Sequence, residues 1–270
     1  MLDMVTSLPQ PTGRFRWVQA AGGRPLPAPA LVCEPLLPYA EHLFTTRGWT
    51  LGRDAASSRD GWDQVADAMG VEPDRLGRLR QVHGATAVVA EPESGSLPDA
   101  DIILSNRTDG AVVVQAADCV PLLLVDRRTG AVAAAHAGWR GLAAGVPGET
   151  VSALNREFGS HPDDLLAAIG PAIGQCCYEV GGDVRAAMFR AFGEDDAARW
   201  FKAGRGTGKW MFDTWTSAGA QLEMAGIPGG QVFAANLCTM SHPAAFCSYR
   251  RDGPPAGRIA AAIRVGGVRQ

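Results

Sequence analysis

The sequence predicts a single domain that mixes helices and strands, of the α/β (α+β) class. Short apolar runs alternate with segments of helical periodicity from about Leu31 onward. The 270 residues contain no visible repeat and no linker long enough to divide the chain. Hydrophobic residues make up 46% of the chain and charged residues 20%, which is typical of a protein with a buried core. We therefore expect one domain over residues 31–270, preceded by an extended segment at 1–30 that is rich in proline and glycine.

One helix and two strands are predicted in the first part of this domain. Residues 58–60 can cap a helix that runs to Met69 and ends at Gly70. A polar side chain satisfies the free N–H groups at a helix start, and glycine tolerates the reversed backbone at its end. The apolar runs 79–82 and 87–90 indicate two strands around a turn.

The middle of the chain predicts an antiparallel hairpin. A strand at 111–115 precedes it, and two further apolar runs at 120–125 and 131–135 form its arms. Residues 126–130 indicate the tight turn between the arms, because Gly130 can adopt a positive φ.

The rest of the chain alternates between helices and strands. Three expected helices each stop at a glycine, and Asp213 caps the last of them. The expected helices are 149–158, 184–192 and 213–225, and the expected strands are 165–169, 231–235 and 258–264.

Charge and composition exclude several classes of protein. The net charge is −3, and a general nucleic-acid binder would carry a basic excess, so we expect no nucleic-acid partner. No apolar run reaches the roughly eighteen residues of a membrane span, and residues 1–14 lack a secretory pattern. Six cysteines are too sparse for a disulfide scaffold, which favours reduced thiols and a cytoplasmic location.

The hairpin brings a thiol and an imidazole together. Cys119 stands just before the outgoing strand and His136 just after the returning one. Both lie about eight or nine residues from the turn centre, so the two residues end within about one position of directly opposite. We expect the two side chains to meet at the open end of the hairpin.

Two chemistries suit this pair, and spacing alone leaves both open. Cys119 can be a nucleophile with His136 as its base. The pair can also belong to a catalytic zinc site completed by His83, which precedes Gly84 at a strand end, with an open fourth position. A cysteine beside an apolar strand also commonly serves only to fill a core.

A turn bracketed by glycines follows His136. Gly138 and Gly141 permit tight backbone geometry, and the next segment becomes helical. Such a strand-to-helix turn presents N–H groups that suit an anion, and Arg140 adds a positive charge.

Three segments of the chain resemble the signature segments of the YfiH family, also described as laccase-domain or polyphenol-oxidase-like proteins and as purine nucleoside phosphorylases. They are 80–84 (RQVHG), 117–123 (ADCVPLL) and 135–141 (AHAGWRG). The similarity spans about residues 40 to 265. Supporting segments lie at 44–48, 169–173, 177–180, 246–253 and 257–258. One departure is Cys247, where the family commonly has an aromatic residue.

The resemblance implies a fold and an activity. It implies a four-layer α/β/β/α domain with mixed sheets, making 31–270 a single YfiH-like catalytic domain. It implies that His83, Cys119 and His136 bind a metal, usually zinc, with copper as the less favoured ion. The implied reaction is phosphorolysis of adenosine, inosine and guanosine, with phosphate as co-substrate and adenosine deamination as a companion activity. It leaves monomer and homodimer open.

Four further residues are candidates for substrate binding. The guanidinium groups of Arg47, Arg140 and Arg250 can hold phosphate or ribose oxygens, although structural ion pairs are an equal interpretation for two of them. Tyr178 can stack on a base or pack at a rim. For Cys176 and Cys177 we expect ordinary packing, because neighbours on a strand point to opposite faces.

Three other functions fit parts of the pattern. A cysteine hydrolase would use Cys119 and His136 to cleave amide bonds such as those of cell-wall precursors. A copper oxidase of phenols is disfavoured, because five histidines cannot build both a blue-copper centre and a trinuclear cluster. A non-catalytic binding protein would need a closed site with a fourth protein ligand.

Overall fold

Two six-stranded mixed sheets pack face to face in the computed structural model, which describes residues 8–49, 51–52, 55–91 and 97–266. In the first sheet all neighbours are antiparallel except β7 and β4. Its order is β1 (Phe15–Ala21), β2 (Arg24–Cys33), β3 (Ala40–Thr45), β15 (Ile259–Val265), β7 (Ala111–Ala116) and β4 (Leu76–Gly77).

The second sheet is antiparallel at its centre and parallel at both edges. Its order is β14 (Val232–Ala234), β10 (Leu165–Ile169), β8 (Val120–Asp126), β9 (Val132–Ala137), β6 (Ile102–Ser105) and β5 (Ala87–Val89). A separate three-stranded sheet has the order β11 (Glu179–Gly181), β13 (Lys209–Phe212) and β12 (Phe201–Ala203).

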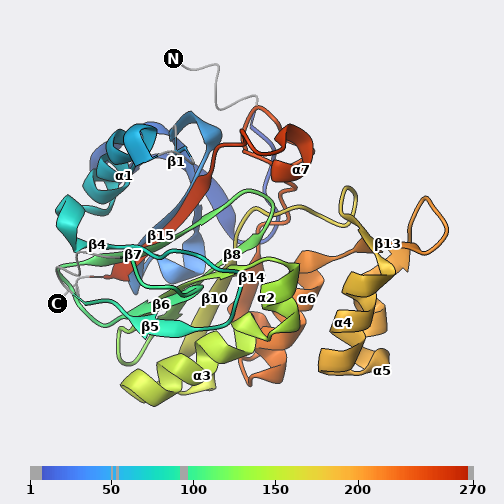
Figure 1. Cartoon of the computed structure of the whole chain (residues 1–270). Helices are drawn as coiled ribbons and strands as arrows, with labels where there is room; N and C mark the ends of the chain where they lie inside the picture. The colour runs from blue at the N-terminus through green and yellow to red at the C-terminus, as the bar shows by residue number, and fades with distance from the viewer. Residues whose placement is uncertain (1–7, 50, 53–54, 92–96, 267–270) are drawn as a thin grey trace.

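Helices cover the outer faces of both large sheets. Helix α1 (Ala55–Met69) packs on the first sheet, and α2 (Trp139–Ala143), α3 (Val146–Phe158) and α6 (Thr214–Met224) pack on the second (Figure 1). Helices α4 (Gly182–Phe192) and α5 (Glu194–Ala197) lie beside the small sheet, and α7 (Tyr249–Asp252) precedes β15. Short 3₁₀ helices span Glu34–Leu36, Arg47–Trp49, Pro73–Arg75, Pro162–Asp164, Ala198–Trp200 and Gly229–Gln231. No described helix is long and apolar enough to span a bilayer.

Three hydrophobic clusters separate the four layers. Met69 and Val113 belong to the cluster under α1, and Leu122 and Leu154 to the cluster under the outer helices of the second sheet. The third cluster, between the sheets, includes Phe44. Strand β8 is buried on both faces, which explains its unbroken apolar run. The predicted four-layer α/β/β/α arrangement with mixed sheets is therefore confirmed.

Elements with strong local signals form as predicted. Strands β8 and β9 form the hairpin, with Gly130 at a φ of 77° in its turn. Gly70 and Gly159 adopt positive φ at the ends of α1 and α3. The carboxylate of Asp213 accepts a hydrogen bond from the Thr216 N–H and caps α6.

Of the two strands predicted around a turn at 79–82 and 87–90, the second forms as β5, but the first does not form and the two segments do not pair. Residues 79–82 contribute only an isolated bridge between Arg80 and Asp99, and β5 pairs in parallel with β6 instead. The chain bends away because the N–H groups of Val82 and Gly84 donate to the buried Asp101 carboxylate. Helix α1 also begins at Ala55, ahead of the expected cap at 58–60.

The N-terminal segment contributes strands to the first sheet. The expected limit at residue 30 falls inside β2. This strand pairs with β1 near both of its ends, around an irregularity, and with β3 at Ala30 and Leu31. The prolines of β2 stand at alternate positions, so the N–H groups that they lack would all have faced the same edge of the strand. The run therefore stays compatible with a strand. Residues 1–7 lie outside the described residues.

Candidate active site

His83, Cys119 and His136 come together at the end of the second sheet. Their ligand atoms lie within 4.8 Å of one another, and 4.0 Å separates the Cys119 Sγ from the His83 Nε2. The two imidazole rings meet edge to face with centroids 4.9 Å apart. His136 is buried, Cys119 is half-buried and His83 is exposed, so the group opens to the surface at His83.

The hairpin places Cys119 and His136 slightly out of register. His136 pairs with Pro121 and Ala137 with Val120, so Cys119 lies level with Gly138, two positions beyond His136. The absent side chain of Gly138 leaves the necessary room. A Cβ at this position would lie 2.9 Å from the Cys119 Sγ and 3.1 Å from the His83 Cδ2.

Asp101 connects the His136 side chain to the backbone around His83, and the sequence reasoning missed it. Its fully buried carboxylate accepts a hydrogen bond from the His136 Nδ1 at 2.8 Å through one oxygen. The other oxygen accepts from the N–H groups of Gly84 at 2.7 Å and Val82 at 3.2 Å. The Nε2 of His136 is thereby left free to bind a ligand. The available signal was an acidic residue directly before the apolar run of β6.

The buried thiol and imidazole stabilise each other's charged forms. Burial alone would raise the pKa of the Cys119 thiol, but the charge of His136 and hydrogen bonds from both histidines lower it to about 6. Burial alone would lower the pKa of His136, but Cys119 and Asp101 raise it to about 9. The mutual attraction of the pair therefore favours the charged form of each group in the absence of a metal.

This donor set suits a borderline-soft ion. One thiolate and two imidazoles are a known catalytic ligand set for zinc, and the same donors also serve copper. The hydrogen bond from His136 to Asp101 is the support that metal-binding histidines commonly have. The residues present therefore fit a metal.

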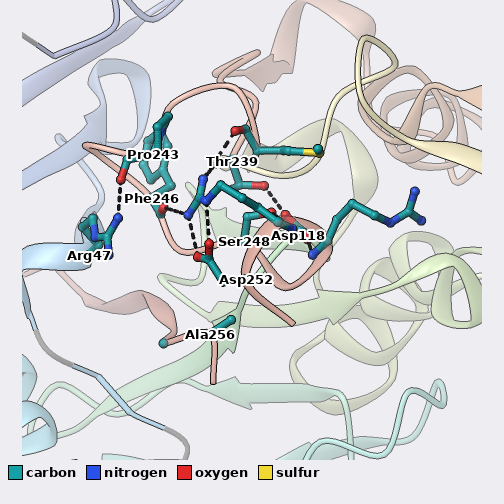
Figure 2. A network of polar contacts seen from close by, with 12 residues as sticks. Arg47, Asp118, Thr239, Pro243, Phe246, Ser248, Asp252 and Ala256 are labelled. Atoms are coloured by element: carbon teal, nitrogen blue, oxygen red, sulfur yellow. Dashed lines mark hydrogen bonds and ion pairs between the residues drawn. The ribbon is translucent and has the colours of Figure 1, made fainter. Parts of the chain in front are cut away.

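Asp118 fixes the wall next to Cys119. Its backbone has a φ of 83°, which non-glycine residues rarely adopt. Its carboxylate accepts hydrogen bonds from the hydroxyls of Thr239 at 2.5 Å and Ser248 at 3.0 Å, and from the N–H of Arg250 at 2.6 Å (Figure 2). These contacts hold the segment 239–252 against the start of β8.

Three of the predicted substrate-binding residues lie near the ligand group. Tyr178 borders a cavity of about 30 Å³ beside Cys119, together with Gly138. Burial and the charge of Cys119 raise the pKa of Tyr178 to about 12. The Arg250 guanidinium lies 5.0 Å from the Tyr178 ring centroid, and the charge of Arg140 also acts on the Tyr178 hydroxyl.

Arg140 and Arg47 have other local contacts. The predicted strand-to-helix turn forms, because β9 leads through Gly138 into α2. The Arg140 guanidinium stacks on the Trp139 ring, 4.3 Å from its centroid. The Arg47 guanidinium donates to the carbonyl of Pro243, and its N–H donates to that of Ala245 (Figure 2). Among the described residues, no recorded contact joins Arg47 to the ligand group.

The fold and these donors define an α/β protein with a candidate three-ligand metal site. The chain belongs to the family described as multi-copper polyphenol oxidoreductase laccase, whose profile matches residues 46–266. This match covers the ligand group and the segment 239–252.

Individual relatives agree with this assignment. The purine nucleoside phosphorylase YfiH of Escherichia coli is 39% identical over 196 residues, which cover 73% of this chain and 76% of the relative. A purine nucleoside phosphorylase of Bacteroides thetaiotaomicron is 36% identical over 167 residues, 61% of this chain and 60% of the relative. The crystal structure of a Bacillus licheniformis hypothetical protein YfiH superposes with a TM-score of 0.82 at 27% identity, covering 88% of this chain and 96% of that one.

Proposed function

We propose that this chain is a zinc-dependent purine nucleoside phosphorylase. It would convert adenosine, inosine or guanosine and phosphate to the free base and ribose 1-phosphate, with adenosine deamination as a companion reaction. The observation that carries the proposal is the position of the His83, Cys119 and His136 group beside a cavity bordered by Tyr178. The names of the relatives from Escherichia coli and Bacteroides thetaiotaomicron supply the reaction class.

His83, Cys119 and His136 would hold the zinc ion. When bound, zinc supplies a Lewis acid that can polarise a substrate oxygen, or activate water for the deamination branch. Asp101 keeps the His136 Nε2 directed at the group, and Gly138 leaves space for it. Tyr178 offers a ring face to the base.

The arginines near Tyr178 suit the charges of phosphorolysis. The reaction passes through an oxocarbenium-like sugar, so the site must hold a phosphate under the sugar and stabilise the departing base. Fixed cations placed where charge develops lower the barrier. Arg140 and Arg250 are the cations near the cavity, and we assign them to phosphate or ribose. Arg47 donates to the carbonyl of Pro243, which belongs to the segment 239–252. It would therefore act on the phosphate only across that segment.

We also propose a cytoplasmic enzyme that acts on free nucleosides as a monomer or homodimer. All six cysteines of the chain are described and are free thiols, which suits a reducing compartment. Fractionation of the native host with an antibody to the chain would test the location, and recovery from an exported fraction would contradict it.

A cysteine hydrolase is the second candidate, and one observation favours it. The Asp101 carboxylate orients His136, and His136 in turn lies beside the Cys119 thiol, as acid, base and nucleophile do in such enzymes. The pKa of this thiol is lowered to about 6. Such an enzyme would cleave amide bonds without needing a metal.

A copper oxidase of phenols finds support only in the family description. Of the five histidines in the chain, His83 and His136 are in the site, and His42 is buried against backbone groups. Too few remain for a trinuclear copper cluster. Phenol oxidation coupled to stoichiometric bound copper in the purified chain would reverse this judgement.

Metal dependence separates the first two candidates. The purified chain is assayed on nucleosides with phosphate and on amide substrates, before chelation, after chelation and after zinc is restored. We expect nucleoside cleavage to disappear with the metal and return with zinc, and to be lost in Cys119→Ala but kept in Cys33→Ala. Amide hydrolysis that survives chelation, without nucleoside cleavage, would establish the cysteine hydrolase instead.

A further inference from the structure

A second group of thiols lies outside the ligand group described above. Cys176 and Cys177 belong to the turn before β11, and Cys238 follows β14. Their sulfur atoms all lie within 4.8 Å of one another, and 3.5 Å separates the Sγ atoms of Cys176 and Cys177. These two residues lie in a turn and not on a strand as expected, so their neighbouring side chains can converge.

Backbone N–H groups point at the Cys238 sulfur. The N–H of Gly174 donates to the Cys238 Sγ at 3.3 Å, and the backbone N–H of Ser241 supports the same sulfur. N–H donors directed at sulfur commonly surround cysteines that bind metals.

A fourth donor completes the group. The Ser241 hydroxyl lies 3.5 Å from the Cys176 Sγ and 3.3 Å from the Cys177 Sγ. Three sulfurs and one oxygen therefore converge from two separate turns. Cys238 is buried and Cys176 is exposed, so the group is anchored on one side and accessible from the solvent on the other.

The spacing of the sulfurs suits a tetrahedral ion. With zinc–sulfur bonds of about 2.3 Å, tetrahedral geometry separates two ligand sulfurs by roughly 3.8 Å. The 3.5 Å between the Sγ atoms of Cys176 and Cys177 is close to this value, and the Cys238 sulfur lies within 4.8 Å of both. Only small side-chain adjustments would be needed to bind the ion.

We propose that Cys176, Cys177 and Cys238 form a second, structural zinc site, with the Ser241 hydroxyl as its neutral fourth donor. Its two turns are already joined by backbone hydrogen bonds from Ala172 to Leu237 and from Thr239 to Ala172. One turn leads to Tyr178 at the cavity, and the other carries Thr239, which binds Asp118. The ion therefore cross-links two walls of the candidate active site and takes no part in its chemistry.

Cobalt(II) tests this site without relying on the proposed reaction. The full chain with Cys119→Ala has no thiolate at the first site, so we expect any charge-transfer absorption between thiolate and cobalt to come from the second group, and further cysteine variants assign it. We expect this variant, kept reduced, to bind one cobalt ion with such absorption, and zinc to abolish it. Adding Cys238→Ala should remove the band, and adding Cys33→Ala, a cysteine between the large sheets, should leave it unchanged.

A gain-of-ligand variant guards against loss through misfolding. Ser241→Cys in the Cys119→Ala chain should intensify the band and tighten zinc binding, since a thiolate replaces a hydroxyl. No thiolate band in the Cys119→Ala chain, or a band that survives Cys238→Ala, would overturn the proposal. An intact mass lower by two hydrogen atoms, with two of these three thiols blocked, would also overturn it by showing a disulfide.

Discussion

At the scale of single residues, the buried Asp101 carboxylate positions the ligand group. One of its oxygens accepts from His136, and the other accepts from the N–H groups of Val82 and Gly84 on either side of His83. An asparagine must turn its NH₂ group toward one of these donors. We therefore predict that Asp101→Asn weakens zinc binding by about 10- to 100-fold. A titration against a competing chelator measures the affinity.

The neighbouring Asp99 provides a matched control for this prediction. It is exposed and forms an ion pair with Arg80, so Asp99→Asn should leave zinc affinity unchanged. Equal affinities of the two variants would show that Asp101 does not orient the ligands.

His42 predicts a pH dependence of stability. It accepts a hydrogen bond from the Cys33 N–H at 2.8 Å and donates to the Ala40 carbonyl, and burial lowers its pKa from 6.5 to about 4. Only the unfolded chain binds a proton at His42 between these values, so the free energy of unfolding falls as pH drops from about 6.5 to about 4. The loss should reach about 3 kcal/mol.

Urea unfolding of the wild type and His42→Gln across this pH range measures the effect. The glutamine amide can also accept from Cys33 and donate to Ala40, but it does not titrate. The difference between the two curves isolates His42 from the carboxylates. Parallel curves would mean that His42 keeps an ordinary pKa in the folded chain.

Sequence motifs could predict the ligands but not the residues that support them. His83, Cys119 and His136 stand in short, specific segments, and hairpin geometry links two of them. Asp101 and Asp118 act through contacts with residues far away in sequence, such as the contact between Asp118 and Ser248. Nothing local indicates such a partner.

At the scale of elements, the turn between β9 and α2 determines whether the ligand group can form. The φ of Gly138 is −72°, so an alanine here meets no backbone strain, but its Cβ would lie 2.9 Å from the Cys119 Sγ. We predict that Gly138→Ala lowers zinc affinity and kcat/KM by about tenfold or more, since small displacements of reacting groups are costly. Metal titration and nucleoside kinetics measure both.

Gly148 is the control for this substitution. A Cβ at Gly148 meets nothing within 4 Å, so Gly148→Ala should keep metal and activity and should not weaken α3. If Gly138→Ala behaves in the same way, the site tolerates the added methyl group and the steric argument fails.

The segment 239–252 is held by one strained aspartate. Asp118→Ala leaves the hydroxyls of Thr239 and Ser248 and the N–H of Arg250 without their acceptor. We predict a loss of about 3 kcal/mol or more in the free energy of unfolding. Urea denaturation measures it.

Two comparisons separate the causes of that loss. Asp118→Gly removes the same hydrogen bonds but relaxes the positive φ, so it should be less destabilising than Asp118→Ala by about 1 kcal/mol. Asp213→Ala, which removes a single helix cap, should cost only about 1 kcal/mol. An Asp118→Ala loss no larger than this would show that the network contributes little.

Elements with local signals were predictable and those with remote partners were not. The β8–β9 hairpin and the helices ending at glycines follow from nearby residues. Strand β5 pairs in parallel with β6, twelve or more residues further along the chain, and the segment 79–82 turns aside to reach Asp101. The short strands of the small sheet carry too few residues for a pattern.

At the scale of the whole molecule, the alternation of apolar runs with helical segments predicted an α/β chain. It did not predict how the sheets and helices stack in layers. The continuous apolar run of β8 is consistent with any doubly buried strand. The sheet that covers the second face of β8 is assembled from strands far apart in the sequence. In that sheet β15, from the C-terminal end, lies between β3 and β7. The family resemblance supplied the four-layer arrangement that the three hydrophobic clusters confirm.

In the proposed reaction, phosphate is a substrate and not only a bound anion. The most direct test incubates the zinc-loaded chain with inosine, with and without phosphate, and identifies the sugar product. We predict ribose 1-phosphate and hypoxanthine, with base release suppressed when phosphate is omitted and both products absent with Cys119→Ala. Equal base release without phosphate, with free ribose as the product, would contradict the account and make the enzyme a nucleoside hydrolase.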